Sequence, residues 1–288
     1  MSTGTRETEK IESTTAEDFL ERLGARSTHW ARDGDSEWLF RGLGDANWKL
    51  HPKAVHTPES FKEHGVTQAS KEVPPTTPLE RRDLINTMLK RFRQGLSRSG
   101  IAIPTSPPRI DAYESNGVSS TAEPSRESFP LMALAQHHGL PTILMDWSRR
   151  SWVAAYFASA SASARKIGPS RDRLCVWALR RHLLLHDGAG RASFLEGPGS
   201  TNANLRAQAG VLSWFVTDDD QSLENHFRNS SHADSGLVAL QQFDLPVSEA
   251  PKLLRLLSYE GISGESMFPG PDGVVRAMKE RALWDQPV

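Results

Sequence analysis

The sequence predicts an α+β fold: a single domain in which a small mixed or antiparallel sheet is flanked by helices. Several segments have the aromatic and β-branched composition of strands. Segments with helical spacing stand at both ends of the chain. The 288 residues, 38% of them hydrophobic, are enough to bury a large core.

The N-terminal part predicts one helix and one strand. Residues 1–13 are polar and are expected to form a flexible terminus. Residues 15–24 begin with a cap-like threonine and end in glycine, which is typical of a short amphipathic helix. Residues 37–42 alternate and are rich in aromatic side chains, which favours a strand. We expect Gly42 and Gly44 to let the backbone turn away after it.

Two polar segments interrupt this pattern. Residues 57–79 are rich in proline, and residues 101–128 are rich in proline, serine and glycine, so both are expected to be loop insertions. Between them, residues 82–96 have apolar side chains at helical spacing. Neither insertion separates two self-sufficient cores. We therefore expect one domain over residues 14–288.

The central segment and the C-terminal half alternate between helices and strands. A helix is expected to begin near Pro130 and to end at Gly139. A short buried strand over residues 142–145 and a helix over residues 149–163 follow. Further strands are expected over residues 173–179, 207–216 and 236–245, and further helices over residues 247–260 and 274–284.

Composition excludes several classes of protein. The formal net charge is −1 and the pI is about 6.8, so no field over the whole molecule attracts nucleic acid or anionic lipid. Cys175 is the one cysteine, so no disulfide forms within the chain. The sequence lacks an apolar run long enough for a membrane span and lacks a signal-peptide core, so we expect a cytoplasmic protein.

The first candidate for chemistry is Phe40-Arg41-Gly42, at the end of a predicted strand. An arginine there would present a planar fork of donors to a pyrophosphate or a carboxylate. Gly42 would let a ligand approach the backbone closely. The alternative is that Arg41 pairs with a carboxylate of the protein and closes the strand end.

The second candidate is the segment from Gln136 to Ser148, in which polar groups flank buried apolar runs. Asp146 or Ser148 would cap the following helix in the structural interpretation. Adjacent helical residues point about 100° apart, so His137 and His138 are not expected to chelate one metal ion, and no metal is expected. One histidine would bond within the core and the other would face a pocket.

Two later segments complete the set. Arg206 and Gln208 would project from one face of a predicted strand, with Gly210 leaving room beside them. A turn-rich loop with Glu265 and Asp272 precedes the last helix. The alternative interpretation of the first segment is an ordinary edge strand, and that of the second is a helix cap.

These segments, in this order, resemble the FRG domain family, which takes its name from the Phe-Arg-Gly motif. The block from Ala135 to Ser148 matches the family's most specific signature, Ala-Gln-His-x-Gly-Leu-Pro-Thr-x-Leu-x-Asp-Trp-Ser/Thr. The resemblance spans roughly residues 38–278.

The order of elements is also distantly similar to that of ADP-ribosyltransferases, which implies NAD as substrate or ligand. In that resemblance Arg41 would hold the ribose or pyrophosphate of NAD, and Ser148 would support the nicotinamide ribose. Gln208 stands where those enzymes have a glutamate, so another acid such as Glu265 or Asp272 would have to act. The implied catalytic residues are Arg41, Ser148, Gln208 and Glu265. The implied NAD contacts are Arg41, Gly42, His138, Asp146, Trp147, Ser148 and Arg206.

Three functional hypotheses follow. The first is ADP-ribosyl transfer or NAD hydrolysis, with an unknown protein or nucleic-acid acceptor. The second is a nucleotide-sensing or NAD-sensing module without fast turnover, in a prokaryotic stress or antiphage pathway, where members of the FRG family are thought to act. The third is nucleic-acid or protein binding through the basic helix over residues 81–98. The oligomeric state stays open.

Overall fold

The structure of the chain is a computed structural model. It describes residues 8–30, 37–56, 60–66, 77–103, 109–112, 126–164, 172–185, 192–196, 203–215, 222–228 and 238–284.

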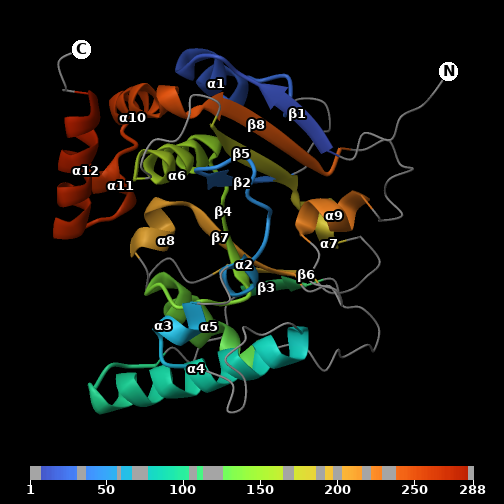
Figure 1. Cartoon of the computed structure of the whole chain (residues 1–288), viewed down its shortest axis with the longest axis vertical. Coiled ribbons are helices and arrows are strands. Elements are labelled where there is room, and N and C mark those ends of the chain that lie inside the picture. The colour runs from blue at the N-terminus through green and yellow to red at the C-terminus, as the bar shows by residue number, and fades with distance from the viewer. Residues whose placement is uncertain are drawn as a thin grey trace.

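A mixed eight-stranded sheet in the order β1-β8-β5-β2-β4-β7-β6-β3 runs through these residues, so the α+β class is confirmed and the sheet is larger than expected (Figure 1). Only β1 and β8 pair in parallel among the described strands. The strands are β1 (Thr8–Glu12), β2 (Trp38–Leu43), β3 (Arg109–Ala112), β4 (Leu144–Ser148), β5 (Arg173–Arg180), β6 (Ala192–Glu196), β7 (Gly210–Phe215) and β8 (Leu240–Pro246).

The two ends of the sheet correct the sequence predictions. β1 lies within residues 1–13, which we expected to be flexible, and its pairing with β8 holds it at one edge. β3 lies within the predicted insertion over residues 101–128 and pairs with β6 at the other edge. Both strands are short and polar, so partners far along the chain are what form them. The predicted insertion over residues 57–79 contains α3 and the first two residues of α4, and residues 57–59 and 67–76 lie outside the described ones.

The helices form two groups at opposite ends of the sheet. Figure 1 shows α4 at the far end of the molecule from α1 and α10. No described helix is both long and apolar enough to cross a membrane. The helices are α1 (Ala16–Leu23), α2 (Lys53–His56), α3 (Ser60–Glu63), α4 (Pro78–Arg98), α5 (Phe129–His137), α6 (Ser151–Ala164), α7 (Arg181–Leu185), α8 (Ala203–Ala207), α9 (Leu223–Arg228), α10 (Ala250–Tyr259), α11 (Gly264–Met267) and α12 (Pro271–Trp284).

Most of the predicted helices are confirmed, together with their end signals. The Thr15 hydroxyl accepts a hydrogen bond from the Asp18 amide at the start of α1. A capping box at Thr77 and Glu80 begins α4. Gly139, with φ of 88°, ends α5 in the left-handed conformation that glycine adopts most readily.

Gly42 and Gly44 seat α6 directly on β2. A Cβ atom on Gly42 would lie 1.9 Å from the carbonyl oxygen of Ala154, and one on Gly44 would lie 2.7 Å from the amide of Ala162. Such distances are impossible without moving the backbone of one element. These glycines therefore serve helix packing, and Gly42 also lines the cleft described below. They also bring α6 close to the strand that carries Arg41.

A buried hydrogen bond fastens the C-terminal helices to α6. The Tyr156 hydroxyl donates to Glu280 Oε1 over 2.6 Å, and Glu280 Oε2 accepts from the Gly264 amide over 3.0 Å. Burial, followed by the Glu280 hydrogen bond and charge, raises the pKa of Tyr156 well above its usual range. The clamp holds α11 and α12, and residues 268–276, which follow α11 and begin α12, form one wall of the cleft described below.

Tyr156→Phe should lower the free energy of unfolding by about 1–3 kcal/mol at neutral pH, because it leaves a buried carboxylate with one partner fewer. The folded state raises the Tyr156 pKa. The contribution of the Tyr156 hydroxyl to the free energy of unfolding is therefore present below pH ~10 and is lost as the pH rises beyond that. The variant should lack this alkaline loss. Urea unfolding at neutral and alkaline pH measures both effects. Tyr259→Phe, at an exposed position, is the control, and an equal effect there would contradict the clamp.

Candidate functional site

A cleft of about 670 Å³ opens beside the middle of the sheet. Its walls come from β2, the end of α5, β4, α6, the region of α8, and residues 268–276 around the start of α12. Of the predicted site residues, the following line it: Arg41, Gly42, His137, His138, Asp146, Trp147, Ser148, Gln208 and Asp272. Arg206 and Glu265 are not among its lining residues.

Arg41 lies at the point where β2 and β4 separate. These strands pair only at Phe40 and Ser148, so the Asp146 carbonyl needs a donor other than the β2 main chain. Arg41 Nη1 supplies it over 2.8 Å and lies 3.8 Å from the Asp146 carboxylate. Arg41 Nε is buried and makes no hydrogen bond to the described residues. Burial lowers the pKa of Arg41, and the Asp146 charge opposes that shift. The Arg41 side chain is 21% accessible, and a partly buried guanidinium with a spare donor is suited to an anionic ligand.

Asp146 is the acid nearest to Arg41 in the cleft. It is the one exposed residue of β4, and its side chain is 67% accessible. Its carboxylate is thus open to a ligand, whereas its backbone carbonyl is held by Arg41. The predicted role of Asp146 as a helix cap is wrong, because β4 continues through it to Ser148.

Ser148 is tied into the framework of the site. Its hydroxyl donates to the Gln208 carbonyl over 2.8 Å and accepts from the Arg150 amide over 3.0 Å. These two bonds use the proton and one lone pair of the Ser148 hydroxyl. Ser148 therefore anchors the turn before β7. This is a positioning contact, and it spans 60 residues of sequence.

Gln208 and Arg206 do not lie on a strand, which corrects the prediction for residues 207–216. Arg206 belongs to α8, and Gln208 lies in the turn before β7, where Ala209 adopts a φ of 45°. Arg206 is exposed outside the cleft. The Gln208 carboxamide donates to the Met267 carbonyl over 3.0 Å, so it links α8 to α11.

Trp147 is a core residue, although it lines the cleft. Its side chain is 3% accessible and packs within the cluster on one face of the sheet. Its indole nitrogen donates to the Ser213 hydroxyl over 2.8 Å. The indole therefore orients β4 against β7.

Two histidines end α5 at the rim of the cleft. His137 and His138 stand edge to face with ring centroids 5.2 Å apart. Burial, and then the neighbouring His138, lower the pKa of His137 below that of a free imidazole. His137 Nε2 lies 3.4 Å from Asn204 Nδ2. Both histidines line the cleft, whereas the sequence analysis expected one of them in the core.

Sequence reasoning missed an aromatic end of the cleft. Phe157 and Phe268 meet edge to face, with ring centroids 6.0 Å apart. The Arg276 guanidinium lies 4.3 Å from the centre of the Phe268 ring. No motif marks these residues, because each lies on a helix face or loop whose orientation depends on packing.

Glu265 lies beside a different cavity, of about 440 Å³, and its carboxylate is 3.6 Å from Arg281. The prediction that Glu265 lies in this cleft is therefore wrong. Asp272, the other predicted acid, does line the cleft. In the described part of the chain, no three His, Cys, Asp or Glu side chains gather closely enough to hold a metal ion.

Comparison with known proteins agrees with the motifs. The FRG domain family model matches residues 36–166, which run from β2 to just beyond α6. The chain contains an FRG domain. The matched region supplies Arg41, both histidines, Asp146 and Ser148, whereas Gln208 and the aromatic wall at Phe268 come from outside it. No curated protein and no solved structure matches the chain.

Proposed function

We propose that the cleft of this FRG domain binds NAD and that Arg41 holds its pyrophosphate. The observation that carries the proposal is the partly buried Arg41 guanidinium, whose Nε makes no hydrogen bond within the described protein. The cleft volume of about 670 Å³ falls within the usual range for ligands of this size. Its aromatic end, with Phe157 and Phe268, offers ring surfaces for a base.

The chemistry that this arrangement favours is ADP-ribosyl transfer or NAD hydrolysis, in the manner of an ADP-ribosyltransferase. The glycosidic bond between C1′ of the nicotinamide ribose and nicotinamide would break, and its electron pair would leave with nicotinamide. An acceptor hydroxyl or water would bond to C1′ and lose its proton to a carboxylate. Asp146 is the best candidate for that carboxylate, because it is accessible and lies beside Arg41. Its negative charge would also stabilise the cationic transition state.

Asp146→Asn should lower the rate of nicotinamide release by about 10²–10³-fold, the usual loss for one electrostatic stabiliser, with NAD affinity little changed. Nicotinamide release and calorimetry with NAD measure the two quantities. Glu265→Gln is the matched control, because Glu265 lines the other cavity. Loss of turnover in Asp272→Asn, with Asp146→Asn fully active, would move the acid to the start of α12.

A second function, NAD sensing without fast turnover, is favoured by two contacts. Ser148 and Gln208, which the resemblance to ADP-ribosyltransferases makes catalytic, are both engaged with backbone carbonyls. Tight NAD binding with no nicotinamide release, in the presence of a cell lysate as a source of acceptors, would select sensing over transfer. A role in a prokaryotic stress or antiphage pathway stays a prediction, and the survival of expressing cells under phage challenge tests it, with Arg41→Ala as the comparison.

A further inference from the structure

The helix α4 has a basic face that the proposed function does not use. From Leu84 to Ile103 the sequence contains four basic side chains, Lys90, Arg91, Arg93 and Arg98, and no aspartate or glutamate. The chain as a whole has a net charge of −1, so this helix is a local concentration of positive charge. Charge that is not balanced locally creates a field that attracts anions.

The basic side chains are available on the outside of the helix. Leu84, Ile85, Met88 and Leu89 are buried against the cluster that includes α5. Lys90, Arg93 and Arg98 are exposed and make no ion pair with the described residues, and Arg91 donates to the Gly65 carbonyl. From Lys90 to Arg98 the helix rises about 12 Å. That length covers two to four phosphates at the ~3.4 Å spacing of one strand of a duplex or the wider spacing of an extended single strand.

The composition of this face favours nucleic acid over a protein partner. Between residues 80 and 98 of α4 no large hydrophobic side chain is exposed, whereas Leu79 and Ile101, which flank this stretch, are exposed. Protein interfaces depend on apolar or aromatic anchors that fill pockets, and this face offers none. Three of its four cations are arginines, whose planar forks match phosphate oxygens.

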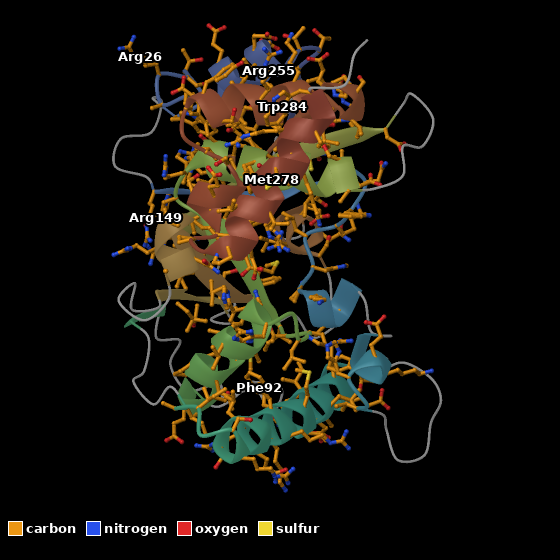
Figure 2. The ribbon with its side chains drawn as sticks, turned by 90° about the vertical axis from the view of Figure 1, so that its left-hand side faces the viewer. Arg26, Phe92, Arg149, Arg255, Met278 and Trp284 are labelled. Carbon is orange, nitrogen blue, oxygen red and sulfur yellow. The ribbon has the colours of Figure 1, made fainter. Side chains whose placement is uncertain are left out.

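The basic helix also lies next to the cleft. Phe92, labelled in Figure 2, packs against the same cluster as the buried side of α4. Its ring centroid is 6.4 Å from that of His138, which lines the cleft. Because Phe92 belongs to the buried side of α4, this contact links the helix to the cleft, and the exposed basic face points away from it.

We infer that the exposed basic face of α4, formed by Lys90, Arg91, Arg93 and Arg98, docks a nucleic-acid strand. The docking follows from the charge and exposure of this face alone and is independent of the proposed function.

Fluorescence anisotropy of the full chain with labelled single-stranded and duplex DNA and RNA, without NAD, tests the docking. We expect dissociation constants of about 10⁻⁶–10⁻⁴ M at physiological salt and a linear fall of log K with log salt. The slope of log K against log salt should become less negative by about 2–3 in the triple variant Lys90→Gln, Arg93→Gln, Arg98→Gln. This corresponds to about 0.7–0.9 for each lost phosphate contact. The control triple variant Arg26→Gln, Arg255→Gln, Lys279→Gln removes the same charge from exposed positions elsewhere and should bind like the parent.

Equal binding by parent and α4 variant, or no binding at 50 mM salt, would overturn the docking. Binding of labelled polyglutamate but not of nucleic acid would also overturn it, in favour of an acidic protein. Because these measurements contain no NAD, failure of the NAD proposal leaves them unchanged. Conversely, loss of nucleic-acid binding leaves NAD calorimetry unchanged.

Discussion

Arg41→Ala should weaken NAD binding by about 10²–10⁴-fold, because it removes two hydrogen bonds from a charged donor to a phosphate, each worth ~1.5–3 kcal/mol. Arg41→Lys keeps the charge but loses the planar fork, so it should recover only part of that affinity. Isothermal calorimetry with NAD and with ADP-ribose gives both values. The affinity for ADP-ribose should fall by the same factor, since ADP-ribose contains the same pyrophosphate.

Two other arginines provide matched controls for the Arg41 variants. Arg26 is exposed at the end of the molecule opposite α4 (Figure 2), so Arg26→Ala should leave NAD affinity unchanged. Arg206→Ala separates the two placements of that residue: the sequence predicts contact with NAD, and the structure places its side chain outside the cleft. Unchanged NAD affinity in Arg41→Ala, with the fold intact by circular dichroism, would refute the proposed site.

Gly42→Ala should cost more stability than any other single methyl group added to the sheet. The new Cβ would lie 1.9 Å from the Ala154 carbonyl oxygen, so α6 must move away from β2. Overpacking of this kind costs about 1–3 kcal/mol or more. At ~2–4 °C per kcal/mol, the melting temperature should fall by several degrees, as calorimetry would measure, or the chain should fail to fold.

Gly95→Ala is the control for this prediction. Gly95 lies inside α4, and a Cβ atom there would meet nothing within 4 Å. This substitution should raise the free energy of unfolding by up to ~1 kcal/mol through helix propensity. If Gly42→Ala were as stable as the parent, the close seating of α6 on β2 would be wrong.

The fold could be predicted where local pattern and burial agree. The helix over residues 15–24 was predictable because its cap, its glycine and its apolar spacing coincide. The strand at residues 38–43 was predictable from its aromatic alternation. By contrast, β1 and β3 carry few apolar residues and exist because partner strands offer hydrogen bonds at the sheet edges. An edge strand of this kind has little signal of its own.

The candidate site was predictable to a similar extent. Arg41, His138 and Asp146 belong to motif segments that reach one cleft. The strand predicted for Arg206 and Gln208 was wrong. Arg206 belongs to α8, and Gln208 lies in the turn that follows, where Ala209 is left-handed. Side-chain periodicity cannot reveal such a turn, since it depends on one backbone dihedral angle.

The sequence by itself determined the class of fold, the main helices and strands, and the FRG motifs whose residues line the cleft, because each depends on neighbouring residues. Only the tertiary structure decided which polar groups remain available to a ligand. It commits the Ser148 hydroxyl to Gln208, 60 residues away, and the Tyr156 hydroxyl to Glu280, 124 residues away, and it leaves Arg41 Nε without a partner among the described residues. The physical reason is that buried polar groups must be hydrogen-bonded, and their partners here come from segments that only folding brings together.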